Sequence, residues 1–462
     1  MFDVQKPVME SQIATHSTDP AEPETPATGR RGFLKAAAAG ALFQILPSRV
    51  FSQSPNGKLN IGFIGAGGRG EANIEACYEE TVYALCDVDD RRCERMVGEF
   101  PAAKYYRDWR VMLEKEGGKL DAVVISTPDH SHAVAAMAAI RMGKHVYVEK
   151  PLTHTISEAR ALLEAARKSG VCTQMGNTGH STDGARLINE FIRSGAIGEI
   201  REVHCVTNRP IWPQDVVRRP ESAVPPHLDW DLWQGPCEPK PFADGIVPFY
   251  WRGFLDYGSG ALGDMGPNII DHPVWALGLG LPKSVEVVCE RKNSKSQLHT
   301  YPASCTISYE FDSVEGRPPV KLVWYDGRQQ IPRPPGLKGD EKLVENGCIY
   351  YGSKHVMMHG SHGGSPRILT DVESFVAPPR TEERSPGHHQ EWIDAIKAND
   401  RSKAKSNFEV AVPLTEMLLL GCIAVRVGTG TRLAWDPASM KTGNETADGF
   451  VHHQYRAGWK LG

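Results

Sequence analysis

The sequence of 462 residues lacks an excess of either charge, since 52 Lys and Arg residues stand against 56 Asp and Glu residues and leave a net charge of −4. A surface that binds nucleic acid normally requires a basic excess, so we expect no nucleic-acid partner. We also find no apolar run near the ~20 residues that span a bilayer, and we therefore expect no membrane anchor in the mature protein. The length suggests two or three domains.

Closely spaced metal ligands are also lacking. The ten cysteines form no Cys-x-x-Cys pair and no zinc spacing, which excludes a disulfide scaffold and favours cysteines that fill the core. Two histidine pairs, His130 with His132 and His388 with His389, have no acidic or Cys partner at ligand spacing. We therefore predict no metal site.

The N-terminal residues have the pattern of a targeting signal. A polar stretch, residues 1–29, precedes Arg30–Lys35, a pair of arginines followed by Gly-Phe-Leu-Lys, and then the short apolar run Ala36–Leu46. This order resembles a twin-arginine export signal, which a translocase reads. The alternative is a helix docked on the domain, but the apolar run has no polar face. We predict that residues 1–57 are a disordered N-terminus with an export signal, cleaved near Ser52, and that the protein is periplasmic or otherwise exported.

A glycine-rich loop, residues 65–70, joins a predicted strand over Lys58–Ile64 to a predicted helix over 71–79. A second predicted strand, Thr81–Cys86, ends at Asp87. Gly-x-Gly-x-x-Gly between a strand and a helix, with an acid after the next strand, is typical of a Rossmann domain that binds a dinucleotide.

The three glycines of the motif have separate tasks. Gly65 permits a tight turn, Gly67 lets the backbone approach the pyrophosphate, and Gly70 allows close packing of helix on strand. Asp87 would accept hydrogen bonds from the ribose hydroxyls and repel a 2′-phosphate, which favours NAD over NADP. Arg91 and Arg92 weaken that preference, because either side chain could meet a phosphate.

The alternation of strands and helices continues. A predicted strand over Leu120–Ser126 ends at Thr127, Pro128 and His132, with an Ala-rich helix after them, and another over His145–Val148 delivers Glu149 and Lys150. Ligands of open parallel sheets collect at the carboxyl ends of the strands. With the motifs below, the predicted cofactor contacts are Gly65, Gly67, Arg69, Gly70, Asp87, Thr127, Pro128, His132, Glu149 and Asn177.

Several motifs in a fixed order resemble the Gfo/Idh/MocA oxidoreductase family. They are the glycine loop, Thr127–His132, Val148–Pro151, Met175–His180, Trp251–Gly258, Gly260–Gly266 and His388–Trp392. The combination with an export signal resembles an exported branch found in carbohydrate-degrading bacteria. The resemblance implies an α/β fold with an NAD-binding Rossmann domain over residues 58–180. It implies a substrate-binding and oligomerisation domain over residues 181–462, of the α+β class, with a large open, mostly antiparallel sheet, and a homo-oligomer.

The second half agrees with such a sheet. Strand-like segments are Ile200–Thr207, Ser284–Glu290, Ala303–Phe311, Val320–Trp324 and Thr431–Trp435. A long loop rich in Pro, Gly and Trp covers residues 209–260, and loops of that length are usually functional. The apolar stretch Leu414–Val427 predicts a helix that closes the domain.

Lys150 is the predicted general base. Oxidation of a sugar hydroxyl requires removal of its proton, and a lysine beside a positively charged nicotinamide and partly removed from water loses its own proton more readily. The family places the lysine of Glu-Lys-Pro at this point; the alternative is a surface lysine. Family members pair it with an Asp and with a His four residues later. Here Asp264 matches, as a catalytic residue or otherwise a helix N-cap, whereas Asn268 stands at the histidine position and cannot relay a proton.

Other side chains complete the predicted site. The resemblance makes His180 a possible second acid or base, with a loop or capping histidine as the alternative. Trp251 and Arg252 offer a flat apolar face beside a fork of donors, which suits a sugar. We predict substrate contacts from Trp251, Arg252, Asn268 and His272.

Three functions compete. The first is an exported NAD-dependent oxidoreductase that acts on a sugar or sugar derivative. The second is an NAD-dependent glycosidase or lyase that works by oxidation, elimination, hydration and re-reduction; export favours a cofactor recycled in this way, since no free NAD pool exists outside the cytoplasm. The third is a non-catalytic protein that binds NAD and sugar. In each case we expect NAD to be tightly bound and loaded before export.

Overall fold

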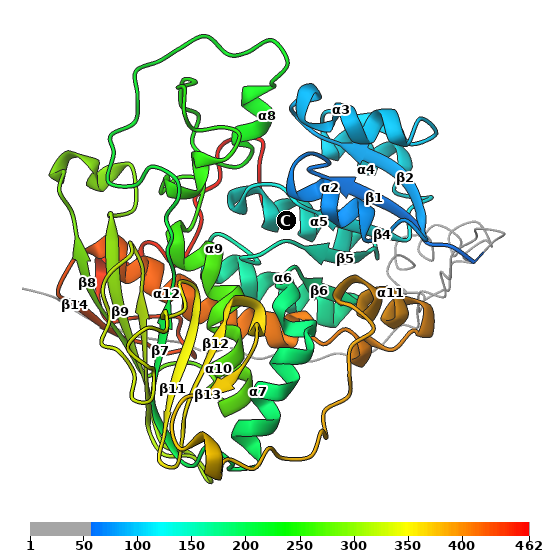
Figure 1. The fold of residues 1–462 in the computed structure, drawn as a ribbon. Coiled ribbons are helices and arrows are strands. Elements are labelled where there is room, and N and C mark those ends of the chain that lie inside the picture. Colours follow the sequence, from blue (N-terminus) through cyan, green and yellow to red (C-terminus); the bar gives the residue numbers. More distant parts are fainter. Residues whose placement is uncertain (1–56, 462) are drawn as a thin grey trace, which may run out of the picture. The chain divides into compact units, whose positions relative to one another are not determined.

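Six parallel strands form the first sheet, in the order β3-β2-β1-β4-β5-β6 (Figure 1). The computed structural model describes residues 57–461, so the predicted export signal lies outside the described residues. The strands are β1 Asn60–Ile64, β2 Thr81–Cys86, β3 Lys104–Tyr106, β4 Ala122–Ile125, β5 His145–Val148 and β6 Thr173–Met175. All four residues of β4 are buried, as expected for a strand covered on both faces.

Helices connect these strands by crossovers. They are α2 Arg69–Glu75, α3 Asp90–Glu99, α4 Trp109–Glu116, α5 Asp129–Arg141 and α6 Ile156–Ser169. The carboxylate of Asp89 caps α3 by accepting from the Arg91 N–H, and Asp108 caps α4 in the same way through Arg110. The predicted strands over Thr81–Cys86 and His145–Val148 match β2 and β5 residue for residue.

The second sheet has eight strands in the order β13-β12-β11-β7-β10-β9-β8-β14. Each neighbouring pair is antiparallel except β7 with β10. The strands are β7 Ile200–Val206, β8 Ser284–Glu290, β9 Ser304–Phe311, β10 Val320–Tyr325, β11 Gly347–Gly352, β12 Val356–Gly360, β13 Arg367–Ile368 and β14 Thr431–Ala434. The predicted fold class, a Rossmann domain followed by an α+β domain with a large, mostly antiparallel sheet, is confirmed.

Helices cover the inner face of this sheet and carry part of the site. They are α7 Asp183–Arg193, α9 Gly260–Ile269, α10 Asp271–Leu277 and α12 Phe408–Val427, with α13 Glu445–Asp448 near the C-terminus. The expectation that no apolar run reaches membrane-spanning length is wrong, because α12 is long and apolar enough. Since 78% of its most apolar window is buried inside the protein, packing in the core accounts for its composition.

One helix of the second half returns to the first sheet. α11, His388–Ala398, packs Trp392 and Ile393 against Ile61 and Phe63 of β1 on the face opposite α5 and α6. Residues far along the chain therefore share the cover of this face of the first sheet with α2 and α3.

The segment 209–257 is a long loop with its own small core. It contains α8 Trp230–Gln234 and the 3-10 turn η2 Tyr250–Gly253. Trp230 stacks on Trp233 at 4.8 Å, and Phe242, Trp251 and Tyr257 complete the cluster. The other 3-10 turns are η1 Thr178–Ser181, η3 Ser294–Leu298, η4 Ser361–Gly363, η5 Val372–Ser374 and η6 Arg401–Lys403.

Candidate active site

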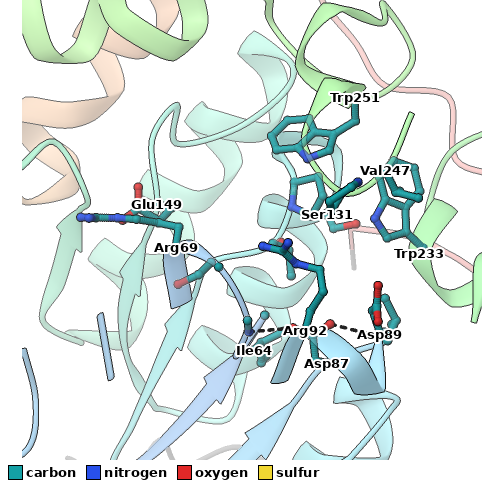
Figure 2. A pocket seen from close by; sticks show the side chains of 18 of the residues that line it. Ile64, Arg69, Asp87, Asp89, Arg92, Ser131, Glu149, Trp233, Val247 and Trp251 are labelled. Atoms are coloured by element: carbon teal, nitrogen blue, oxygen red, sulfur yellow. Dashed lines mark hydrogen bonds and ion pairs between the residues drawn. The ribbon is translucent and has the colours of Figure 1, made fainter. Parts of the chain in front are cut away.

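A cavity of about 420 Å³ lies where the carboxyl ends of the first sheet meet α9 and the segment 209–257 (Figure 2). The loops after β1, β2, β4 and β5 form one wall, as expected for an open parallel sheet. Of the predicted site residues, those that line it are Gly65, Gly67, Arg69, Asp87, Thr127, Pro128, Glu149, Lys150, Trp251, Arg252 and Asp264.

The glycine loop forms a cradle that larger residues would fill. Gly65 has a φ of +81°, which only glycine adopts readily in a turn this tight. A Cβ on Gly67 would lie 2.6 Å from the carbonyl oxygen of Arg92, and a Cβ on Gly70 would overlap the carbonyl oxygen of Gly65. Gly70 therefore packs the helix on the strand and does not line the cavity.

The cradle fits a dinucleotide. The N-terminus of α2 presents backbone N–H groups to the cavity, and the Gly67 N–H is held by the Asp87 carboxylate at 2.9 Å. The hydroxyl of Thr127 is buried at the cavity wall and has no hydrogen-bond partner among the described residues. A buried polar atom without a partner costs free energy that a ligand would restore. Residues 65–70 would thus hold the pyrophosphate, and Asp87 the ribose.

Asp87 and Arg92 stand together at the ribose end of the cavity, and Figure 2 shows Arg92 reaching into it beside Asp87. Burial raises the pKa of Asp87 to about 6, although it accepts N–H bonds from Gly67 and Asp89. Arg91, the other arginine with a predicted influence on cofactor choice, does not line the cavity.

Lys150 and Asp264 form the polar centre of the cavity. The Lys150 ammonium donates to the Asp264 carboxylate at 2.9 Å and to the backbone carbonyl of the same residue at 2.6 Å. Arg252 donates to the same carboxylate oxygen at 3.3 Å. Burial opposes ionisation of Asp264, but Lys150 and Arg252 outweigh it and lower its pKa. Since α9 begins at Gly260, Asp264 lies inside the helix, and the N-cap interpretation is wrong.

Glu149 anchors the first residue of α2. Its carboxylate accepts from Arg69 at 2.7 Å and from the Asn73 amide at 3.1 Å. Burial disfavours its charge, yet Arg69 and Lys150 lower the pKa of Glu149. The Arg69–Glu149 ion pair holds the end of β5, and with it the adjacent Lys150, next to the glycine loop.

Aromatic side chains of the segment 209–257 form the opposite wall. Trp233 and Trp251 face Arg92 across the cavity in Figure 2. The Arg252 guanidinium lies 4.3 Å from the Trp251 ring and 4.4 Å from the Phe249 ring. This arrangement holds a flat apolar surface beside a charged donor.

This wall is tied to the Rossmann domain by strap residues 227–235. The Asp229 N–H donates to the Val88 carbonyl at 2.8 Å, and the Asp90 N–H donates to the His227 carbonyl at 3.1 Å. Arg456, from the last segment of the described chain, donates to the Gly235 carbonyl at 2.6 Å. The strap thereby lies over the ribose end of the cavity, close to α3 in Figure 1.

The structure places His180 away from the cavity. Its ring bonds the Asp271 carboxylate at 2.8 Å and stacks on Trp275 at 4.1 Å, and both polar partners are buried. Burial disfavours ionised Asp271, but His180 outweighs this and lowers its pKa. The pair joins η1 to α10.

Four further predicted residues do not line the cavity either. His132 lies within hydrogen-bond distance of two backbone carbonyls, those of Pro151 and Thr127. Asn177 accepts from the Ser406 hydroxyl at 2.6 Å, Asn268 donates only a 3.5 Å bond to the Asp264 carbonyl, and His272 is buried without a hydrogen-bond partner among the described residues. In this structure these side chains support the loops behind the site.

Sequence reasoning missed two titratable groups near Lys150. Asp129 lines the cavity, and burial raises its pKa to about 6. His362 lies in η4, which packs on α9 and η1. Burial lowers the pKa of His362, and the nearby charges of Lys150 and Arg69 lower it further. Asp129 belongs to the motif Thr127–His132, so the sequence contained a signal for it. The residues around His362 form no recognisable motif. Among residues 57–461, no group of three or more potential ligands could hold a metal ion.

The fold and the cavity define a two-domain dinucleotide-binding protein, and the comparisons with known proteins agree. The model of an oxidoreductase family with an NAD-binding Rossmann fold matches residues 59–177, and the C-terminal α/β domain of the same family matches residues 202–461. The chain belongs to the Gfo/Idh/MocA oxidoreductase family.

Individual relatives are more distant. A levoglucosan dehydrogenase from Pseudarthrobacter phenanthrenivorans is 26% identical over 232 residues, 48% of this chain and 51% of the relative. A glycosyl hydrolase family 109 protein from Solibacter usitatus is 33% identical over 198 residues, 37% of this chain and 44% of the relative. The chain thus spans about half the length of these relatives or less. The WlbA dehydrogenase of Bordetella pertussis, solved with NADH and UDP-GlcNAcA, has a TM-score of 0.57 at 16% identity over 82% of this chain and 99% of that one.

Proposed function

We propose that the protein is an exported NAD-dependent oxidoreductase that acts on a sugar or sugar derivative. The observation that carries the proposal is the Lys150–Asp264 pair, held in one cavity with a dinucleotide cradle. Family membership supports the cofactor, and the named substrates of the relatives support a carbohydrate.

Lys150 is the general base in this proposal. In this structure Lys150 is an ammonium paired with Asp264, and beside a bound nicotinamide cation it would give up that proton. The neutral amine, positioned by Asp264, then takes the proton from the substrate hydroxyl, while Arg252 orients the substrate. NAD, when bound, supplies the hydride acceptor. Trp251 presents a ring face to the apolar side of a sugar, and the neighbouring guanidinium binds its hydroxyl rim.

The loss of the family histidine at Asn268 leaves a place for another proton carrier. We assign it to His362 of η4, after β12, because its ring interacts with the charges of Lys150 and Asp264, although it does not line the cavity in this structure. Because its lowered pKa keeps the ring neutral near pH 7, it is able to accept a proton there.

The test of the base uses Lys150→Ala, with Lys168→Ala as the matched control, since Lys168 is exposed on α6 and paired only with Glu164. Sugars are offered to protein whose nicotinamide content has been measured, and formation of reduced cofactor is followed. We expect the first variant to lose activity at least ~100-fold while it retains NAD, and the control to be unchanged. Full activity in Lys150→Ala would show that Lys150 is not the base.

The second candidate is an NAD-dependent glycosidase. The strap residues 227–235 favour it, because a covered cofactor suits a reaction that regenerates it in every turnover. Aryl release from aryl glycosides without net NADH would select the glycosidase. Reduced cofactor that persists until an external acceptor is added would select the dehydrogenase, and NAD binding with neither reaction would select a non-catalytic sugar-binding protein.

The proposal includes export by the twin-arginine translocase and assembly as a homo-oligomer. Replacing Arg30 and Arg31 by lysine should abolish export, which cell fractionation measures. Light scattering measures the mass of the purified protein; a monomer would contradict the assembly.

A further inference from the structure

Two cysteines lie opposite each other on adjacent strands of the second sheet, and neither lines the cavity. Cys289 is the next-to-last residue of β8 and pairs with Cys305, the second residue of β9, and their sulfur atoms are 2.8 Å apart. Cys289 is the only one of the ten cysteines that is not buried.

The backbone around this pair suits a disulfide. The Cys305 N–H and carbonyl both bond to Asp326, and the Cys289 N–H bonds to the Thr429 hydroxyl. These backbone groups therefore form no hydrogen bond between the two cysteines, which makes Cys289 and Cys305 a non-hydrogen-bonded antiparallel pair. Such pairs bring Cα atoms to about 4.5 Å, within the range of about 4.4–6.8 Å that a disulfide bridges.

We propose that Cys289 and Cys305 are a modification site, at which a disulfide forms across β8 and β9 when the folded protein meets a low-molecular-weight or protein disulfide. The Cys289 thiolate attacks the external disulfide and releases one thiol. Cys305 then gives up its proton, its sulfur attacks the Cys289 sulfur, and the second external thiol leaves with that proton, so that two protein thiols are oxidised and one external disulfide is reduced.

The order of the two attacks follows from exposure. Burial raises the pKa of the Cys305 thiol well above its usual value, so Cys305 stays protonated and inaccessible until Cys289 has reacted. The chain offers an internal control, because Cys205 and Cys348 form a second cross-strand pair at 3.3 Å with both residues buried. No external disulfide reaches that pair in the folded protein.

The bond would restrain the loop that supports the cavity wall. Between the two cysteines, the His299 carbonyl accepts from the Leu255 N–H at 3.0 Å, and the Tyr301 N–H donates to the Gly253 carbonyl at 3.0 Å. Gly253 directly follows Arg252, and Leu255 lies two residues further along the chain. A closed loop of this size lowers the entropy of the unfolded chain, so the oxidised protein should melt at a higher temperature.

The experiment treats the full folded protein with oxidised glutathione, quenches it with acid, and counts thiols in denaturant. We expect loss of two of the ten thiols, a peptide linked through Cys289 and Cys305 in the non-reduced digest, and a raised Tm that dithiothreitol reverses. Cys305→Ser should stop at a glutathione adduct on Cys289, and Cys289→Ser should keep all nine remaining thiols. Ten unreacted thiols in the wild type, a stable glutathione adduct, or a link between Cys205 and Cys348 would each overturn the proposal.

Discussion

Replacing Asp87 by asparagine should make the cofactor-free protein more stable near neutral pH and weaken its binding of NAD. The carboxylate is half-buried at the ribose end of the cavity, where its partial removal from water raises its pKa from 3.8 to about 6. A carboxylate kept there at a cost fits a role in binding a ligand, in addition to its two backbone hydrogen bonds.

The magnitude follows from the pKa. At about 1.36 kcal/mol per unit, the shift corresponds to a cost of about 3 kcal/mol for the ionised form. The folded protein binds the proton more tightly than the unfolded chain, so stability falls as the pH rises from about 4 to about 6, and the full cost is present above that window. Asparagine removes the charge but can accept only one of the two backbone hydrogen bonds from Gly67 and Asp89. The lost hydrogen bond lowers the stability of the variant by about 1 kcal/mol. The net gain should be about 2 kcal/mol.

Urea unfolding of both proteins without cofactor, at about pH 4 and about pH 7.5, measures this gain. We expect the variant to exceed the wild type only at the higher pH, and calorimetry should show NAD bound roughly 10- to 100-fold more weakly. Asp326→Asn is the control, since burial raises the pKa of Asp326 to about 7 but it does not line the cavity, and NAD affinity should be unchanged. Equal stability at both pH values, with NAD affinity intact, would refute the reasoning.

Three other predictions test separate parts of the site. Gly70→Ala should lower the Tm and weaken NAD binding, because the new Cβ would overlap the Gly65 carbonyl oxygen. The control Gly98→Ala, which has open space around it on α3, should be neutral or stabilising by up to ~1 kcal/mol. Similar Tm values for the two variants would contradict this packing. Asp264→Asn should lower kcat about 100-fold with NAD retained, as single-turnover kinetics can show. Arg456→Ala should release NAD about tenfold faster in a chase experiment, and unchanged release would mean that the strap does not retain the cofactor.

Local pattern was enough for much of the fold. β2 and β5 were predicted residue for residue, because short apolar runs between turn residues are a local signal. The strands β3, β6 and β11–β13 were missed, since several are only two or three residues long and their place in a sheet depends on partners distant in sequence.

The site divides in the same way. The glycine loop, Asp87 and Lys150 follow directly from strand ends, so the residues around them reveal the dinucleotide cradle and the base. The contact of Lys150 with Asp264, the approach of His362, and the strap over the ribose end join segments that are 90 or more residues apart along the chain. Which distant groups meet, and which histidines are instead enclosed behind the site, depends on how the two sheets and their helices pack, and only the tertiary structure decides that.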